Sequence, residues 1–429
     1  MPNKKTSRRT FLQSTAKTAG LAMTASLWPR KANARIIGAN DKINLGMIGV
    51  GGRGGALVDE FLRLGERCKI VAVCDVWERR KNEEAQKCDA AGYTDYHEVL
   101  MRSDIDAVVV ATPDHWHAKI SIDAMEAGKD VYCEKPMTKT IEEAKKVYEA
   151  SEKLKRIIQV GSQYASMDMN WQARKIIEEG RIGKQVWSQG TYCRNSREWE
   201  WNWPMDMNAG PDKGGDDHID WKMWLGASPN VDYDPERYFR FRKYWDYSGG
   251  IATDLFYHKL AALTVCSGDE FPYRVTGTGG IWVQSDSREV PDTFFTNIDY
   301  PSNRSVIMPS SMASNIGLPT IIRGNCGTIY CDDPEPNHLR VVADEPFGAE
   351  FEKLNGSKEF VVKPEKREGH QANFLTCVQT REQPHLNALR GYIVMVPIAM
   401  SVEAYRRNEV LFFNEKNHRV TSKAFKLKS

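Results

Sequence analysis

The chain has 429 residues and an ordinary globular composition, so it is long enough for two domains with cores of their own. No segment reaches the run of about eighteen apolar residues that a membrane span needs, so no stable membrane anchor is expected. The formal charge is +2, but residues 1–34 hold seven Lys and Arg and no acid. The remainder has 52 basic against 57 acidic residues. A mature charge of −5 predicts no nucleic-acid partner.

Residues 1–34 have the order of an export signal. A twin-arginine pattern contains Arg8 and Arg9, a short apolar run covers 19–28, and Ala32-Asn33-Ala34 offers an A-x-A cleavage site. A disordered basic tail is the alternative. We expect the twin-arginine machinery to export the protein to the periplasm after it folds in the cytoplasm.

Strands alternate with helices over 41–160. The pattern predicts a first strand from Ile43 and further strands at 69–75, 105–111, 130–133 and 156–160, with helices at 55–64, 78–90, 118–127 and 141–153. Such alternation is typical of a doubly wound parallel sheet with helices on both faces. The fold class is therefore α/β, with an N-terminal Rossmann domain over 41–160.

The pattern changes near Gly161 and predicts a C-terminal α+β domain over 161–414. Its strands are expected at 185–194, 273–284, 293–300, 304–311 and 321–331, and they indicate a mainly antiparallel, open-faced sheet. Helices are expected at 170–179, 371–379 and 390–407. We expect the last helices, over 371–407, to pack back on the assembly.

The first strand runs into a glycine-rich turn, Gly49-x-Gly51-x-x-Gly54. The three glycines permit a tight turn, a close approach of backbone to a pyrophosphate, and close packing of helix on strand. Asp75 follows 21 positions after Gly54, about where an acid binds the adenosine ribose. An unoccupied βαβ unit is the alternative. Asp75 favours NAD over NADP, although the nearby Arg79 and Arg80 weaken that preference.

Two later strands end in polar residues that should share one sheet edge. The strand at 105–111 runs into Thr112-Pro113-Asp114-His115-Trp116-His117, and the strand at 130–133 runs into Glu134-Lys135-Pro136. Ligands of open α/β sheets bind at the carboxyl ends of the strands. We therefore expect both turns beside the nicotinamide, although Lys135 on its own would be assigned to the surface.

With these motifs the chain resembles the Gfo/Idh/MocA family, the glucose–fructose oxidoreductase and inositol dehydrogenase group, from about residue 43 to 414. Glu134-Lys135-Pro136 is the specific match, and the segments 179–184, 224–226 and 373–377 add to it. The leader suggests an exported branch. The motifs and the resemblance together predict a cofactor site formed by Gly49, Gly51, Gly52, Arg53, Gly54, Asp75, Thr112, Pro113, His115, His117, Glu134 and Lys135.

The family's second signature, Asp-x-x-x-His, is matched by Asp254 and His258 after Gly249-Gly250. A spacing of four would place both on one helix face. A helix cap and a core histidine are the alternative. The resemblance implies a catalytic set in which His258 is the general base, Asp254 orients it or contacts substrate, and Lys135 stabilises the alkoxide.

Candidate substrate residues follow the second domain's first strand. Trp199, Trp201 and Trp203 alternate, and on a strand they would share one face suited to sugar C–H groups, although a row of Trp is equally typical of a core. The weaker substrate candidates are Tyr164, Tyr192, Arg194 and Trp199. The nine cysteines are odd in number and contain no CxxC, so buried thiols and no metal site are expected.

Three functions remain open from the sequence. The first is an NAD-dependent oxidoreductase acting on a secondary hydroxyl of a sugar, glycoside or cyclitol. The second is redox-neutral glycoside cleavage or epimerisation with tightly bound, internally recycled NAD. The third is a sugar-binding protein without activity. The family also implies a homodimer or homotetramer.

Overall fold

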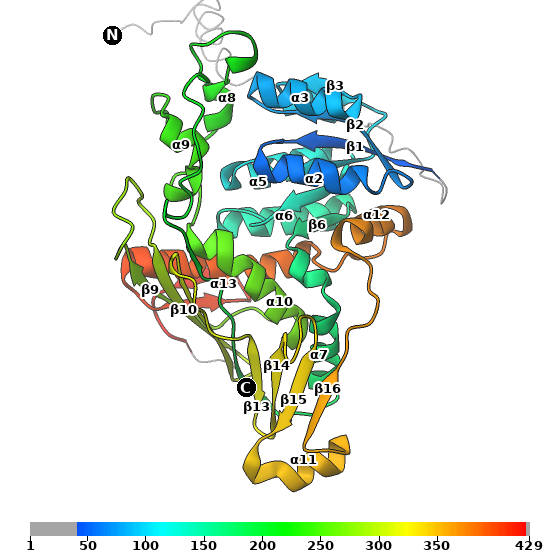
Figure 1. The fold of residues 1–429 in the computed structure, drawn as a ribbon, viewed down its shortest axis with the longest axis vertical. Helices are drawn as coiled ribbons and strands as arrows, with labels where there is room; N and C mark the ends of the chain where they lie inside the picture. The colour runs from blue at the N-terminus through cyan, green and yellow to red at the C-terminus, as the bar shows by residue number, and fades with distance from the viewer. Residues whose placement is uncertain (1–40, 426–429) are drawn as a thin grey trace, which may run out of the picture.

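The computed structural model describes residues 41–425, so the predicted export signal at 1–34 lies outside the described residues. Six parallel strands form the first sheet in the order β3-β2-β1-β4-β5-β6 (Figure 1). This is the doubly wound order of a dinucleotide-binding fold, as predicted. The strands are β1 (Ile43–Ile48), β2 (Cys68–Cys74), β3 (Ala91–Tyr93), β4 (Ala107–Val110), β5 (Asp130–Glu134) and β6 (Ile158–Gly161).

Helices cover both faces of this sheet, which explains why every residue of β4 and β5 is buried. They are α2 (Gly52–Leu62), α3 (Glu78–Cys88), α4 (Tyr96–Met101), α5 (Asp114–Glu126) and α6 (Ile141–Leu154). Two begin earlier than expected. Gly51 is the N-cap of α2, and α5 starts directly after Pro113, so His115 and His117 lie in the first turn of a helix.

The second sheet has ten strands in the order β16-β15-β14-β13-β7-β11-β10-β9-β17-β18. Only β7 and β11 pair in parallel, so the sheet is mainly antiparallel, as predicted. The strands are β7 (Gln185–Gln189), β9 (Arg274–Gly280), β10 (Thr293–Tyr300), β11 (Arg304–Ser311), β13 (Ile321–Gly324), β14 (Gly327–Cys331), β15 (Leu339–Ala343), β16 (Glu359–Val362), β17 (Leu411–Asn414) and β18 (Arg419–Thr421).

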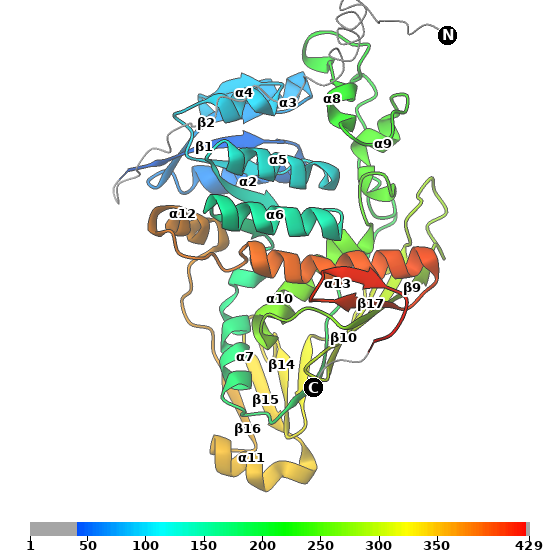
Figure 2. The same cartoon turned by 180° about the vertical axis from the view of Figure 1, so that it is seen from behind.

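Most helices of the second domain lie on the side of this sheet that is toward the first domain, whereas the helix at 348–355 lies at the end of the sheet far from it (Figures 1 and 2). The longer ones are α7 (Asp168–Glu178), α10 (Tyr257–Ser267), α11 (Gly348–Asn355), α12 (His370–Thr380) and α13 (Ala388–Arg407). The shorter ones are η1 (Gln163–Ser166), η2 (Gly215–Asp217), α8 (Trp221–Leu225), α9 (Pro235–Phe239), η3 (Phe241–Lys243), η4 (Ala252–Phe256) and η5 (Glu345–Phe347).

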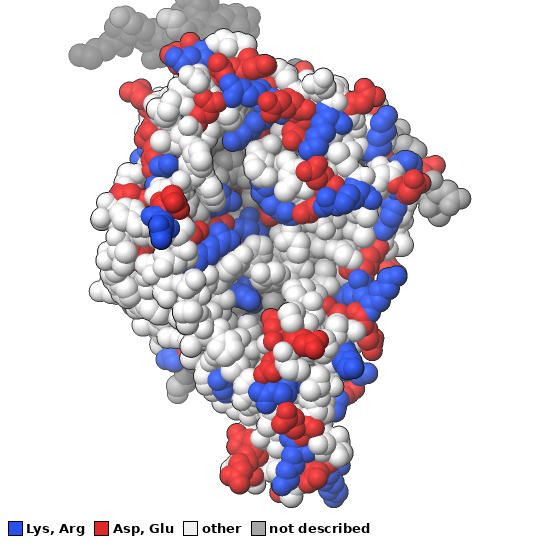
Figure 3. All heavy atoms as spheres, viewed as in Figure 1, with Lys and Arg blue, Asp and Glu red and all other residues white. Residues whose placement is uncertain are grey.

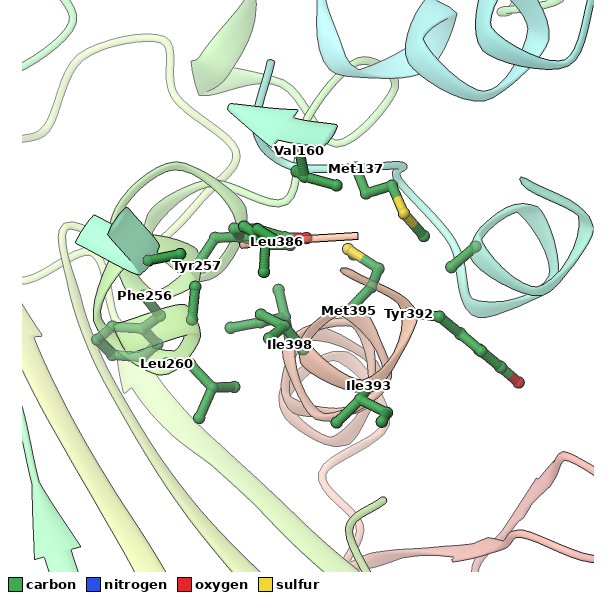
Figure 4. Close-up of a cluster of buried hydrophobic side chains, with 14 of the residues drawn as sticks. Met137, Val160, Phe256, Tyr257, Leu260, Leu386, Tyr392, Ile393, Met395 and Ile398 are labelled. Carbon is green, nitrogen blue, oxygen red and sulfur yellow. The ribbon is translucent and has the colours of Figure 1, made fainter. Parts of the chain in front are cut away.

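A shared core joins the two domains. Figure 4 shows Met395 and Ile398 of α13 beside Tyr257 of α10, with Met137 and Val160 of the first domain above them. All five side chains are buried. The C-terminal helices therefore return to the Rossmann domain, and α12 does so as well through Phe374, whose ring meets that of Tyr132 on β5 at 5.7 Å.

Several predicted strands end sooner than expected. The strand expected at 185–194 stops at Gln189, and β8 (Arg194–Asn195) pairs instead with β12 (Ala313–Ser314) in a separate small sheet. The strand expected at 273–284 stops at Gly280, because the Asp292 carboxylate accepts the backbone N–H groups of residues 282–284 and holds them out of the sheet. The expected strand at 321–331 is a hairpin of β13 and β14.

The tryptophan segment is not a strand. Trp199 has φ 63° and Trp201 has φ 68°, which is left-handed backbone, so the period-two alternation expected there does not exist. Within residues 41–425, no helix is long and apolar enough to cross a membrane. The same part of the chain contains no cluster of three or more His, Cys, Asp or Glu side chains arranged to hold a metal ion.

Candidate active site

A cavity of about 700 Å³ lies between the carboxyl edge of the parallel sheet and the second domain. The glycine turn, the ends of β2, β4 and β5, and parts of η1, η4 and α10 all contribute to its wall. Figure 3 shows a hollow at the centre of one face of the molecule, with Lys and Arg atoms inside it. Its volume is in the range usual for small-molecule sites.

The glycine turn is built for close contact. Gly49 has φ 81°, and a Cβ on Gly54 would meet the Gly49 carbonyl oxygen at 2.0 Å, so the third glycine permits α2 to pack on the turn. Gly49, Gly51, Gly52 and Arg53 line the cavity, and nothing lies within 4 Å of a Cβ added to Gly52. The turn therefore leaves open space at the N-terminus of α2, where an anionic group is favoured.

The predicted ribose-binding acid is at the cavity wall but engaged with backbone. Asp75 Oδ2 accepts the Val50 N–H at 2.8 Å, and Asp75 Oδ1 accepts the Trp77 N–H at 2.9 Å. Each carboxylate oxygen can accept a further bond. The side chain is thus fixed at the end of β2 and can still accept ribose hydroxyls.

The arginines after Asp75 have different environments. Arg79 forms ion pairs with Asp206, at 2.5 Å, and with Asp217. Arg80 lines the cavity, with its guanidinium 4.6 Å from the ring centre of Trp77. Arg79 is therefore engaged with the second domain, and Arg80 faces the space above the glycine turn.

A segment of the second domain, residues 205–239, crosses the first domain at this end, and we call it the strap. Its backbone bonds with the start of α3: the Glu78 N–H donates to the His218 carbonyl at 3.0 Å and the Asp220 N–H to the Val76 carbonyl at 2.9 Å. Tyr238 of α9, at the end of the strap, lines the cavity. The strap therefore closes the end of the cavity that is next to Asp75.

The residues that follow β4 lie in different environments, and one of them also contacts the turn after β5. Thr112, Pro113 and His117 line the cavity, and the buried Thr112 Oγ1 has no hydrogen-bond partner within residues 41–425. His117 Nε2 and Nδ1 lie 2.8 and 2.6 Å from the carbonyls of Thr112 and Pro136, so it ties the two turns together. His115 does not line the cavity. It is buried against the strap, with Nε2 3.0 Å from the Trp224 carbonyl.

Glu134 and Lys135 both reach the cavity at the end of β5. Glu134 accepts Arg53 Nε at 2.9 Å, which fixes that guanidinium beside the glycine turn. Lys135 Nζ donates to the Asp254 carboxylate at 2.5 Å and to the Asp254 carbonyl at 2.8 Å. An ammonium has three donors, so one remains for a ligand in the cavity.

Asp254 is the centre of a charge cluster that the sequence did not predict. Besides Lys135, its Oδ1 accepts Arg242 Nε at 3.0 Å, and its Oδ2 accepts the buried Trp201 Nε1 at 3.1 Å. Burial would raise the pKa of Asp254, but the charges of Lys135 and Arg242 outweigh it and hold that pKa well below its usual value. The carboxylate is therefore ionised and fixed.

His258 is oriented by Ser162 and has no bond with Asp254. Its Nδ1 lies 3.0 Å from Ser162 Oγ. Asp254 lies on η4, a π-helical turn that precedes α10, and both side chains line the same cavity. Burial and the charges of Lys135 and Arg194 keep the pKa of His258 well below its usual value, which leaves a neutral imidazole. When Nδ1 carries the proton, Nε2 has the lone pair of a base.

Three of the four substrate candidates line the cavity and one does not. Tyr164, Tyr192 and Arg194 line the cavity, and the Tyr164 and Tyr192 rings lie 5.3 and 6.0 Å from that of His258. Trp199 does not line it, whereas Trp203 does. The left-handed backbone of the segment explains why Trp203 reaches the cavity and Trp199 does not.

Two residues of the site escaped sequence reasoning, Ser162 and Arg242, and Trp201, which was expected to share a substrate face, donates to Asp254 instead. Ser162 follows directly after β6, and its place at the carboxyl end of a parallel strand is a signal that could have identified it. No motif marks Arg242, because it lies in a short irregular segment that long-range contacts place.

Two family models match the chain. "Oxidoreductase family, NAD-binding Rossmann fold" (GFO_IDH_MocA) covers residues 43–162, and "Oxidoreductase family, C-terminal alpha/beta domain" (GFO_IDH_MocA_C2) covers 168–276. Together they span more than half of the sequence. The chain belongs to the Gfo/Idh/MocA family of oxidoreductases, and its first domain is an NAD-binding domain. The open space at Gly52 and the unpartnered Thr112 hydroxyl fit such a cofactor.

Inositol 2-dehydrogenase from Salmonella paratyphi B is 28% identical over 166 residues, covering 38% of this chain and 49% of that protein. A glycosyl hydrolase family 109 protein from Saccharopolyspora erythraea is 31% identical over 172 residues, 37% of each. The matches thus span about half or less of these curated relatives. A levoglucosan dehydrogenase structure, in complex with NADH and levoglucosan, has the same fold, with a TM-score of 0.65 at 20% identity over 87% of this chain and 99% of that chain.

Proposed function

We propose that the protein oxidises or reduces a secondary hydroxyl of a sugar, glycoside or cyclitol with NAD. The observation that carries this proposal is the Lys135–Asp254 ion pair on the same cavity as a neutral His258. The similarity to inositol 2-dehydrogenase and to the levoglucosan dehydrogenase fold supports the substrate class. Bound NAD would supply the hydride acceptor.

The residues of the chain handle the proton and the developing charge. His258, held through Nδ1 by Ser162, takes the hydroxyl proton on Nε2. The unengaged donor of Lys135 stabilises the alkoxide as it forms. Asp254 keeps Lys135 in place through the 2.5 Å contact.

A test begins with protein purified from cells and assayed for bound dinucleotide. Addition of hexoses, glycosides and inositols should increase the absorbance of reduced cofactor for at least one of them. Lys135→Ala and His258→Gln should each abolish most turnover, whereas Lys146→Ala, at an exposed position of α6, serves as the control. Absence of bound and bindable NAD would refute the proposal.

A second candidate shares the site and returns the hydride within each cycle, giving glycoside cleavage or epimerisation. The similarity to the glycosyl hydrolase family 109 protein favours it. The strap that closes the Asp75 end of the cavity is suited to a cofactor that stays bound. Release of an aglycone or epimer without net growth of reduced cofactor would distinguish this function from a dehydrogenase.

Export and assembly complete the proposal. The twin-arginine leader supports transfer to the periplasm with NAD loaded beforehand, and replacement of Arg8 and Arg9 by Lys should retain the protein in the cytoplasm on fractionation. The half-exposed Phe295 and Ile307 on the strands of the second sheet support a homodimer or homotetramer. Light scattering of the purified protein tests this assembly.

A further inference from the structure

The substrate end of the cavity has more cations than carboxylates. Lys135, Arg194 and Arg242 line it. They face two carboxylates, Asp254 and Glu200, and Glu200 Oε2 lies as far as 4.0 Å from Arg194 Nη1. One positive charge therefore remains without a counter-charge beside the catalytic pair.

The two arginines also have unused donors. Arg242 Nε donates to Asp254 Oδ1 at 3.0 Å, and Arg194 Nη2 donates to the Tyr192 hydroxyl at 3.2 Å. Within residues 41–425 neither guanidinium makes another hydrogen bond. A guanidinium has five N–H donors in a planar fork, so both arginines have donors free for a ligand in the cavity. Both groups are partly buried, with side chains 35% and 22% exposed.

Aromatic rings fix both guanidinium groups. Arg194 lies 4.8 Å from the ring centre of Tyr192, and Arg242 lies 4.6 Å from that of Phe241 and 5.4 Å from that of Trp203. Stacked guanidinium groups lose little conformational freedom when they bind a planar oxyanion. The pair is thus organised in advance for an acceptor in the cavity.

We infer that the substrate is a sugar acid, a hexuronic acid or its glycoside, whose carboxylate is bound by Arg194 and Arg242 while a ring hydroxyl meets His258. This inference rests on the proposed oxidoreductase function and specifies its substrate. One surplus charge matches the monoanionic carboxylate, whereas a phosphate brings about −1.5 to −2. The reaction is unchanged: the C–H hydride passes to NAD and the O–H proton passes to His258.

The test compares matched sugars on the NAD-loaded protein: D-glucuronate with D-glucose, and D-galacturonate with D-galactose, each also as its methyl glycoside. We expect kcat/KM for the better uronate to exceed that of its neutral partner by about tenfold to a hundredfold. Arg194→Gln should reduce this ratio to below about threefold through a higher KM for the uronate. Arg194→Lys should restore part of it.

Arg197→Gln is the matched control, because Arg197 is exposed and close in sequence but does not line the cavity. Calorimetric titration of the same sugars measures binding without turnover. Equal kcat/KM for acid and neutral partners, or a preference for galactose 6-sulfate over galacturonate, overturns the inference and leaves the oxidoreductase function standing. Arg194-dependent uronate binding with no reduction of NAD supports the binding mode and refutes the redox function instead.

Discussion

Replacement of Trp201 by Phe tests whether the Asp254 charge cluster controls the reaction. Trp201 Nε1 donates to Asp254 Oδ2, whereas Lys135 and Arg242 both bond with Oδ1. Without the indole N–H, the carboxylate can rotate about its bond and draw Lys135 Nζ with it. Phe retains most of the buried volume and the same backbone requirement at this left-handed position.

The size of the effect follows from the bond that is lost. A hydrogen bond to a charged group contributes about 1.5–3 kcal/mol, and 1.4 kcal/mol is a factor of ten in rate. We therefore expect kcat to fall by about tenfold to a hundredfold. Affinity for NAD should change little, because Trp201 does not line the cavity.

Steady-state kinetics with a responsive sugar and fluorescence titration with NADH separate these outcomes. Trp199→Phe is the control: Trp199 has the same left-handed backbone two residues earlier and does not line the cavity. The reasoning fails if Trp201→Phe keeps full kcat, or if Trp199→Phe loses as much. An equal loss of NADH affinity would point to general damage to the fold and would also refute it.

Three further outcomes are expected. Gly54→Ala should abolish NAD binding, since its Cβ would collide with the Gly49 carbonyl, whereas Gly369→Ala, at an exposed glycine with open space and away from the cavity, should retain it; calorimetry checks both, and equal affinities would contradict this account of the turn. Arg79→Ala should raise the dissociation rate of NADH measured by stopped-flow chase, because it frees the strap; an unchanged rate would show that the strap does not retain the cofactor. Burial lowers the pKa of His115 to about 4, so between pH 6.5 and 4 the unfolded chain binds more protons and the protein becomes less stable as the pH is lowered. In urea unfolding, the free energy of unfolding of His115→Gln should fall by about 3 kcal/mol less than that of the unchanged protein over this interval. Parallel plots of stability against pH for the two proteins would refute the assignment.

The sequence predicted the parts of the site that follow from strand order. Parallel strands place their carboxyl ends at one edge, so the glycine turn, Thr112 and Lys135 could be brought together from periodicity alone. The structure places all three on one cavity. The same argument extends to Ser162, which directly follows β6.

The rest depended on backbone that has no period. Two left-handed residues interrupt the tryptophan segment, so Trp201 turns toward Asp254 and Trp203 toward the cavity, whereas a strand would place both with Trp199. Arg242 reaches Asp254 from a short helical turn after the strap. Hydrogen bonds between distant segments determine these positions, and a local pattern does not record them.

The π-helical turn η4 has a consequence for how this site tolerates changes in chain length. A π-helical turn is closed by an i→i+5 hydrogen bond, so it contains one residue more than the corresponding α-helical turn. Deletion of Ala252 would restore regular α-helical geometry and rotate the residues before the deletion by about 100° relative to α10. Ser248 before that residue and Thr253 after it both donate to the Asp114 carboxylate, at 2.8 and 3.2 Å. The deletion would separate these two donors, so a single-codon change outside both catalytic positions is expected to be as harmful as replacing one of them.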